Sequence, residues 1–596
     1  MSAVVLLASI LAISSSPNLS SPWPFITIRQ VDVSHALEKF DEIIGVNARH
    51  PGSADEYWLC YCGGHPIDKT ARRFAKHASA CEKMKKAGIV IGCQQGETLG
   101  HGNLAAPEGL FPDDAWQVDR TGQRMRRLCP RSPAVLTYEA DLVEAILKAQ
   151  NVRSIWLDDD LRMGLGSKPD GCYCDRCIAA FNEEYGIRLT RAELVARLDG
   201  PAPKEELRAK WRLFKNKSLA CFGAAARRGA DRVDPSVRLC YQSLDSMDLK
   251  PCESYIPLLE ALAGGHGRQS AIRAGAGTYY ESMPRIYAKS LSVARDAERC
   301  HRSPVVAQVS YEQETYTREV LHKSAEAVLI ESAMALAAGA DALTEYWWDA
   351  DRDEPASYYE EFAEMIVEWR PYLEKIAAIS RVTSLGGLAR YRGADYLQAK
   401  AHSIRSEIDL EFGTFGVPMT VFDAQQGLYY VCEKTLDEFG PGDAERIARE
   451  GAVVDAAIWD RFLKLVPDVS RTVKFDFLKM MHRTPCSVPT HAERAAFLDA
   501  VDRIKPLPVR IDRAHPLHVY PRVAADGRTK AVTLVNASIG KCLPTEVRVR
   551  KPVSSGAWWY RPGEKPVELP AVGASGERVV RMPGLPGSQV GTIVFE

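Results

Sequence analysis

Residues 133–160, PAVLTYEADLVEAILKAQNVRSIWLDDD, contain the pattern that decides the fold. The part 133–149 spaces its apolar residues as a helix does, and 154–160 is a short apolar run that closes in three aspartates. A helix leading into such a run is the repeating unit of a parallel sheet. Helical segments accompany further runs of this kind at 89–94, 237–243, 304–312 and 341–348.

The units are numerous enough to predict a closed barrel followed by two smaller domains. About eight of them fit between residues 30 and 380, which is typical of a (β/α)8 TIM barrel, placed here at 1–382. We expect 383–506 to form a Rossmann-like or flavodoxin-like α/β domain, with GVPMTVFD (416–423) as one strand. Short runs separated by Gly and Pro predict a small β-sandwich over 507–596.

Composition excludes several classes of partner. The 596 residues include 76 Lys+Arg and 77 Asp+Glu, a net charge of -1 without a basic block, so we expect no nucleic-acid partner. The apolar run Val4–Ile13 falls short of the roughly 20 residues that span a bilayer, and no basic residue precedes it. We expect no membrane partner, a buried first strand in this run and a cytoplasmic protein, and leave open whether residues 1–25 are cleaved.

Carboxylates and aromatic residues gather where the predicted barrel strands end. The carboxyl ends of barrel strands converge on one mouth, where active sites are built. Glycosidic cleavage needs one carboxyl group to protonate the leaving oxygen and another to attack or to activate water, with aromatic rings to hold the sugar. The pattern therefore predicts a site for a small carbohydrate. Its residues are Asp158, Asp159 and Asp160; Tyr279, Tyr280 and Glu281; Tyr311 and Glu312; and Glu345, Tyr346, Trp347 and Trp348.

Three cysteines form a second motif, Cys172-x-Cys174-x2-Cys177, in a loop rich in Gly and Asp. A closed tetrahedral zinc site needs a fourth ligand, and Cys129 is the best candidate because it ends the segment before the helix that feeds the aspartate strand. The remaining cysteines of the 15 are scattered, which argues against a disulfide framework. We expect a structural Zn2+ on the four thiolates.

With these segments in order, the first 380 residues resemble glycoside hydrolase family 42, the bacterial β-galactosidases, and its relatives. The match covers the cysteine set, the triple aspartate and the strand ends beyond them. The predicted order of barrel, Rossmann-like domain and β-domain is also similar to that family. The segments are KKAGIVIG (85–92), VDRTGQRMRRLCPRSP (118–133), WLDDD (156–160), GCYCDRCIAAFNEEYG (171–186), VSYEQET (309–315) and GADALTEYWW (339–348).

The resemblance implies roles for individual residues. Glu312 would be the nucleophile and Asp160 the general acid/base, with Asp159 in the place of an Asn that contacts the sugar 2-hydroxyl. It also implies zinc on the four cysteines and a homo-oligomer, a trimer or a dimer. We expect the substrate to be contacted by Asp158, Arg162, Tyr280, Glu281, Tyr311, Glu345, Trp347 and Trp348.

One departure from the family leaves alternatives open. This chain has Asp-Asp where the family has Asn-Glu, and a shorter side chain can widen the separation of the two carboxyl groups, which distinguishes inverting from retaining enzymes. The acid can therefore be Asp158, Asp159 or Asp160, with Glu314, Glu345 or Glu281 as alternative partners. A catalytically silent sugar-binding barrel is the rival from another class. The sugar and its anomer are not specified by the sequence.

Overall fold

The structure is a computed structural model. It describes residues 23–32, 38–62, 65–100, 109–163, 171–199, 205–245, 255–275, 277–315, 323–348, 356–393, 407–422, 427–440, 442–482, 484, 487–573 and 576–596. The predicted first strand at Val4–Ile13 lies outside these residues. Among the helices of the described ranges, none is long and apolar enough to cross a membrane.

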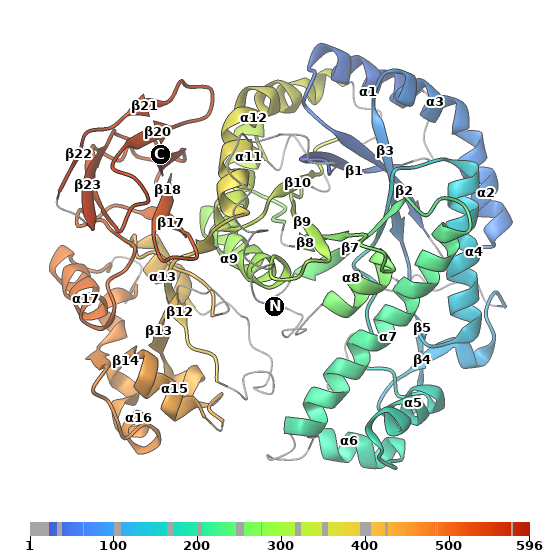
Figure 1. The fold of residues 1–596 in the computed structure, drawn as a ribbon, viewed down its shortest axis with the longest axis horizontal. Coiled ribbons are helices and arrows are strands. Elements are labelled where there is room, and N and C mark those ends of the chain that lie inside the picture. The colour runs from blue at the N-terminus through green and yellow to red at the C-terminus, as the bar shows by residue number, and fades with distance from the viewer. Residues whose placement is uncertain are drawn as a thin grey trace, which may run out of the picture.

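A closed barrel of parallel strands occupies the N-terminal part of the chain, as predicted (Figure 1). The strands pair in the order β1-β10-β9-β8-β7-β6-β3-β2, so the last strand closes on the first through Ile26 and Leu343. In the described part of the chain the barrel strands are β1 Ile26–Asp32, β2 Glu56–Cys62, β3 Val90–Gly96, β6 Ser154–Leu157, β7 Arg238–Asp245, β8 Ser270–Gly275, β9 Val306–Glu312 and β10 Ala342–Glu345.

Helices surround the barrel, or pack on the helices that do so as α5 and α6 pack on α7, and they bury their apolar faces. They are α1 Glu38–Arg49, α2 Ile67–Lys76, α3 Ala78–Lys86, α4 Pro133–Ala149, α5 Asp175–Tyr185, α6 Arg191–Asp199, α7 Glu205–Asp231, α8 Ile256–Ala263, α9 Met283–Cys300, α11 Ala325–Ala338 and α12 Glu360–Ser380. A short hairpin, β4 Trp116–Val118 and β5 Arg124–Leu128, precedes α4. The α11 helix begins at Ala325, where the Ser324 side chain accepts a hydrogen bond from the Ala327 amide and caps the first turn.

A parallel α/β sheet follows the barrel. Its strands are β12 Gly387–Arg390, β13 Gly427–Val431, β14 Ala452–Asp455 and β15 Thr472–Phe475, and its helices are α13 Glu407–Thr414, α14 Glu433–Leu436, α15 Asp443–Glu450, α16 Trp459–Leu465 and α17 His491–Ile504. The strand expected in GVPMTVFD is wrong: β12 takes the place beside β13, and 416–422 runs along β12 with one isolated bridge at Met419. Pro418 lacks the N–H that a ladder strand donates.

Antiparallel strands complete the chain as two sheets with a shared core, which confirms the predicted C-terminal β architecture. Two residues that follow the barrel, Ser384 and Leu385, form one short strand of the larger sheet before the α/β region begins. That sheet contains β11 Ser384–Leu385, β17 Leu517–Val523, β18 Thr529–Asn536, β24 Val590–Phe595, β20 Ala557–Tyr560 and β21 Val567–Glu568. The other contains β16 Val509–Arg510, β19 Thr545–Arg550, β23 Glu577–Met582 and β22 Ala571–Val572.

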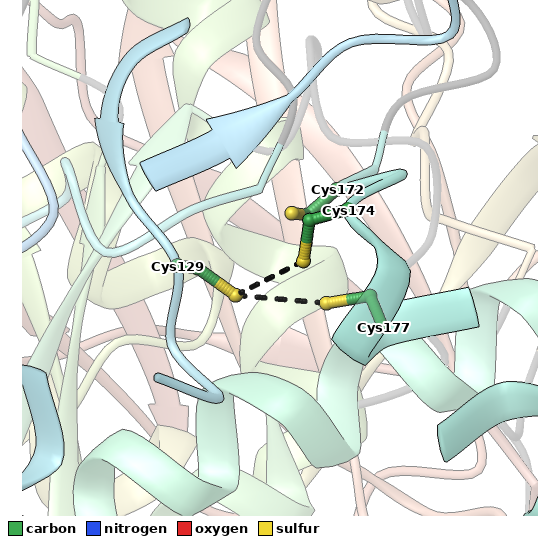
Figure 2. Close-up of side chains that lie close together, drawn as sticks. All are labelled: Cys129, Cys172, Cys174 and Cys177. Atoms are coloured by element: carbon green, nitrogen blue, oxygen red, sulfur yellow. Dashed lines mark hydrogen bonds between the residues drawn. The ribbon is translucent and has the colours of Figure 1, made fainter. Parts of the chain in front are cut away.

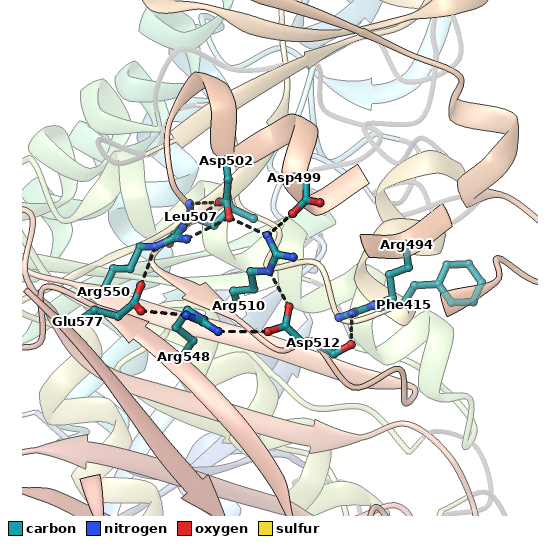
Figure 3. A network of polar contacts seen from close by, with 10 residues as sticks. All are labelled: Phe415, Arg494, Asp499, Asp502, Leu507, Arg510, Asp512, Arg548, Arg550 and Glu577. Carbon is teal, nitrogen blue, oxygen red and sulfur yellow. Dashed lines mark hydrogen bonds and ion pairs between the residues drawn. The ribbon is translucent and has the colours of Figure 1, made fainter. Parts of the chain in front are cut away.

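An ion-pair network joins α17 to the smaller C-terminal sheet (Figure 3). Arg510 contacts Asp499 at 2.8 Å and Asp502 at 3.0 Å, both on α17. Arg550 of β19 contacts Asp502 at 2.8 Å and Glu577 of β23 at 3.4 Å. Because several charges share partners, this network holds the helix to the sheet more firmly than isolated surface pairs would.

Arg522 of β17 joins the C-terminal sheet to the barrel. Its guanidinium is buried and donates to the carbonyl oxygens of Ala338 at 3.1 Å and Ser380 at 2.8 Å. These carbonyls belong to the last residues of α11 and α12, where the helix dipole favours a positive charge. Arg522 therefore caps two barrel helices from another domain.

We expect Arg522→Met to lower the free energy of unfolding by about 3 kcal/mol, because it leaves buried carbonyl groups without a donor. Calorimetric melting of the full chain measures the effect. Arg528→Met is the matched control beside the same sheet, because Arg528 is exposed, pairs with nearby Asp526 and donates only weakly to the Val553 carbonyl oxygen at 3.5 Å, so its loss should cost about 0.5 kcal/mol or less. Equal shifts for the two variants would contradict the capping role.

Candidate functional site

Carboxylates from two barrel strands meet at one buried guanidinium. Arg273, on β8, has a side chain that is only 1% exposed. It forms an ion pair with Glu312 at the end of β9, and its other terminal nitrogen lies 3.9 Å from Asp158 and 3.7 Å from Asp159, which follow β6. Burial lowers the pKa of Arg273, and neighbouring Arg29 lowers it further. The mouth of the barrel thus holds carboxylates that face one another across a single cation.

A second arginine holds the opposite side of this cluster. Arg29 of β1 is buried, forms an ion pair with Glu314 and lies 3.3 Å from Glu312. Its guanidinium also lies over the Tyr346 ring, 5.1 Å from the ring centre. The Oε1 atom of Glu312 therefore contacts two guanidinium groups, an environment that favours the ionised carboxylate.

Asp160 follows directly on Asp158 and Asp159 and is held by Thr98. It is fully buried, and its Oδ1 accepts hydrogen bonds from the Thr98 hydroxyl at 2.6 Å and the Thr98 amide at 3.1 Å. Burial, reinforced by the charge of Asp158, raises the pKa of Asp160 to about 8. Its Oδ2 has no hydrogen-bond partner in the described part of the chain. Asp160 is therefore protonated near neutral pH, whereas Asp158 and Asp159 are about one-fifth exposed and contact Arg273.

The aromatic and acidic end of β10 lies in the protein interior. Trp347 is 0% exposed and stacks on Phe362 of α12 at 5.6 Å, and Trp348 packs against Tyr359 at 5.1 Å. Glu345 is also buried and accepts from Ser332 at 2.8 Å, and burial raises its pKa to about 8. These side chains support the mouth from the barrel's outer layer.

The substrate-contacting residues expected near the ends of β8 and β9 are of two kinds: some are anchored to α11 and others are exposed. The Tyr311 hydroxyl donates to Glu331 of α11, and Glu281 accepts from the Ser324 amide at 2.8 Å, so both engage α11. Tyr280 is 44% exposed, and its hydroxyl accepts a hydrogen bond from Arg285. Neighbouring Tyr279 is 53% exposed.

Sequence reasoning missed the two arginines of the cluster. Arg162, which we expected to contact the substrate, makes no ion pair with an aspartate in the described residues, and Arg273 is the arginine that contacts the two aspartates. The available signal was an arginine inside an apolar strand, ITIRQVD for Arg29 and SAIRAG for Arg273. A buried charge must be paired, so each predicts a carboxylate on a neighbouring strand.

The four predicted metal ligands meet in one buried cluster (Figure 2). The sulfur atoms of Cys129, Cys172, Cys174 and Cys177 all lie within 4.8 Å of one another. The Cys129 sulfur is 3.6 Å from that of Cys177 and 3.9 Å from that of Cys174. Sulfurs on a tetrahedral zinc ion with bonds of about 2.3 Å would be roughly 3.8 Å apart. The cluster can therefore hold a metal ion with four thiolate ligands, between the β5–α4 segment and the start of α5.

The chain folds as a TIM barrel followed by a parallel α/β sheet and antiparallel C-terminal sheets, and it contains one buried cluster of four cysteines among the described residues. No protein-family model matches the sequence, and no curated protein matches it. Solved structures do match over nearly the whole chain, which confirms the expected likeness to family 42 β-galactosidases at the level of fold.

Three of these solved structures illustrate the range of proteins that share this fold. The α-L-fucosidase isoenzyme 2 from Paenibacillus thiaminolyticus has a TM-score of 0.57 at 10% identity, covering 96% of this chain and 100% of its own. The β-galactosidase from Bacillus circulans sp. alkalophilus has a TM-score of 0.55 at 11% identity, and the match covers 96% of this chain and 99% of its own. A catalytic mutant of a GH42 β-galactosidase from G. stearothermophilus has a TM-score of 0.53 at 11% identity, and the match covers 96% of this chain and 98% of its own. At these identities the similarity shows the fold alone.

Proposed function

We propose that this protein is a glycoside hydrolase that cleaves a small carbohydrate with a pair of carboxyl groups. The observation that carries the proposal is the contact of one buried guanidinium, Arg273, with Glu312 after β9 and with Asp158 and Asp159 after β6. Carboxyl groups that face each other at the carboxyl end of a barrel are what glycosidic cleavage requires. The solved structures with this fold include β-galactosidases, which supports a β-linked galactoside as one substrate class to test.

In this proposal Glu312 is the attacking carboxylate. Its ion pairs with Arg273 and Arg29 keep it ionised and orient it toward the mouth. A nucleophile must be unprotonated to form the glycosyl-enzyme of a retaining mechanism. Retention of configuration is the outcome that this role predicts.

Asp160 is the proposed general acid. Its pKa of about 8 keeps the carboxyl group protonated at neutral pH, as an acid must be, and the unpartnered Oδ2 is the atom that would carry the proton. Asp159 is the alternative, because about one-fifth of its side chain is accessible and it shares Arg273 with Glu312. Asp158 then supports the charge balance of the cluster.

Zinc is the metal that we propose for the four-cysteine cluster. The donor set of four buried thiolates leaves no position for water, so the ion would be structural and take no part in hydrolysis. When bound, it would fix the segment that contains Cys172 and Cys174 against the segment that precedes α4.

A panel of aryl glycosides tests the proposed activity. The fold occurs in an α-L-fucosidase as well as in β-galactosidases, so the panel must contain both sugars in both anomeric forms. Release of the aryl alcohol from one of them, with proton NMR of the first sugar anomer, identifies specificity and stereochemistry. A silent sugar-binding barrel would bind a sugar in calorimetry and release no aryl alcohol, which would overturn the proposal.

The acid role is tested by leaving-group dependence. We expect Asp160→Asn to be severely slow on a disaccharide and much less impaired on a dinitrophenyl glycoside, because an activated phenol needs little protonation. With Asp160 as the acid, kcat should fall as pH rises through about 8, where this group loses its proton. Asp159→Asn and Asp158→Asn are the matched comparisons. If the leaving-group dependence appears in Asp159→Asn instead, the acid role passes to Asp159.

A further inference from the structure

A buried ion pair lies directly behind the proposed catalytic cluster. Lys323 precedes α11 and Glu331 is on that helix, and their side chains are 0% and 1% exposed. Removing two such charges from water costs several kcal/mol unless further hydrogen bonds satisfy them. Both groups have such partners, and those in the described residues belong to the end of β9 and to the loops after β8 and β9.

On the β9 side, the pair holds the backbone on both sides of Glu312. The Lys323 ammonium donates to the Glu314 carbonyl oxygen at 2.7 Å, and the Tyr311 hydroxyl donates to Glu331. Adjacent strand residues point to opposite faces, so Tyr311 reaches outward to α11 while Glu312 reaches inward to Arg273. The segment that carries Glu312 is thus held from the outer layer by the ion pair and from inside by the arginines.

On the β8 side, the same carboxylate anchors a second loop. Glu331 accepts from the Thr278 amide at 3.3 Å and from the Thr278 hydroxyl at 3.2 Å. The far end of this loop is held by Glu281, which accepts from the amide and the hydroxyl of Ser324, both at 2.8 Å. Between the two anchors lie Tyr279 and Tyr280, the exposed rings of this part of the mouth.

Tyr279 lies between these two anchors, close enough to the catalytic cluster for the charges there to act on its hydroxyl. Burial of part of the ring raises the pKa of its hydroxyl, and the charges of Glu314 and Asp159 raise it further. Tyr280 turns instead to α9, where Arg285 lies over its ring at 5.1 Å. One buried ion pair therefore lies at the common base of a loop that presents an aromatic ring and a loop that presents the attacking carboxylate.

We propose that Lys323 and Glu331 are positioning residues that set the place of Glu312 relative to Tyr279 across the mouth. The inference rests on the proposed function for the role of Glu312. It goes beyond that function because it assigns the geometry of the site to a pair that touches no substrate. A displacement of about 1 Å in a catalytic group can cost about 100-fold in rate.

Paired substitutions separate this role from simple stabilisation. Lys323→Met and Glu331→Leu alone each leave a buried charge or donor without its partner, so both should lower the melting temperature and kcat. The double variant carries neither charge, and replacing a whole buried pair by apolar residues commonly restores stability. We expect its melting temperature to recover only in part, because Thr278 and Tyr311 lose their acceptor, while kcat stays about 100-fold below wild type and KM changes by less than about threefold.

The matched control is Glu438→Gln compared with Glu331→Gln. Glu438 is equally buried and pairs with Arg390 at 2.7 Å, but it lies in the α/β region. The Glu438→Gln substitution should lower the melting temperature and leave kcat unchanged. Recovery of kcat together with stability in the Lys323/Glu331 double variant, or equal kcat losses for the two Gln variants, would overturn the positioning role.

Hydrogen exchange gives a readout that does not need activity. In the double variant, the amides of both Thr278 and Ser324 should exchange faster than in wild type, because the pair that joins the two loops is gone. Glu438→Gln should change neither. Unchanged exchange at Thr278 would overturn the link between the loops. If wild type hydrolyses no glycoside of the panel, the proposed function fails, and the exchange result still decides whether the pair joins the loops.

Discussion

Glu312→Gln should lower turnover on the preferred aryl glycoside by roughly three orders of magnitude or more. The amide is nearly the same size as the carboxylate, but it cannot form the glycosyl-enzyme that divides one hard displacement into two easier ones. Its two guanidinium neighbours, Arg29 and Arg273, lose an anionic partner, so a small loss of stability is also expected. Steady-state kinetics at a temperature well below the melting point measures the effect.

Sugar binding separates loss of chemistry from loss of structure in this variant. Isothermal calorimetry with the released monosaccharide should give a similar Kd for Glu312→Gln and wild type. Glu314→Gln is the matched comparison, because Glu314 shares Arg29 and lies two residues away. Turnover of Glu312→Gln within tenfold of wild type, with a large loss in Glu314→Gln, would move the attacking role to Glu314.

Loss of the proposed zinc should have the largest effect on stability. Structural zinc contributes on the order of 10 kcal/mol of folding free energy in small domains, so Cys174→Ser should lower the melting temperature by roughly 10 °C or more. Elemental analysis of the purified wild-type chain should find one zinc per chain. Dissociation of the metal by a strong chelator should lower the melting temperature of wild type to that of the variant.

A cysteine outside the cluster controls for the substitution itself. Cys300 is buried in α9, away from the other four, so Cys300→Ser should cost packing energy without changing the metal content. The zinc proposal would be contradicted by a wild-type chain that contains no metal and whose four clustered thiols react freely with a thiol reagent.

Much of the architecture follows from local sequence pattern. The alternation of helical segments with short apolar runs predicted the barrel, because periodicity depends on neighbours in the chain. The spacing of Cys172, Cys174 and Cys177 predicted a ligand cluster for the same reason, and Cys129 completes it in the structure. The strand expected at 416–423 failed because an apolar run alone does not show which segment takes the ladder, and Pro418 cannot donate to one.

The sequence by itself determined that carboxylates collect at the strand ends, because the chain order of strand and loop is sufficient for that. Only the tertiary structure decided which of them face one another. Asp158 and Asp159 reach Arg273 while Asp160 turns to Thr98, and Trp347 and Trp348 are packed against α12. The physical reason is that Arg29 and Arg273 meet Glu312 only when the barrel closes, and a buried guanidinium then selects the carboxylates that neutralise it.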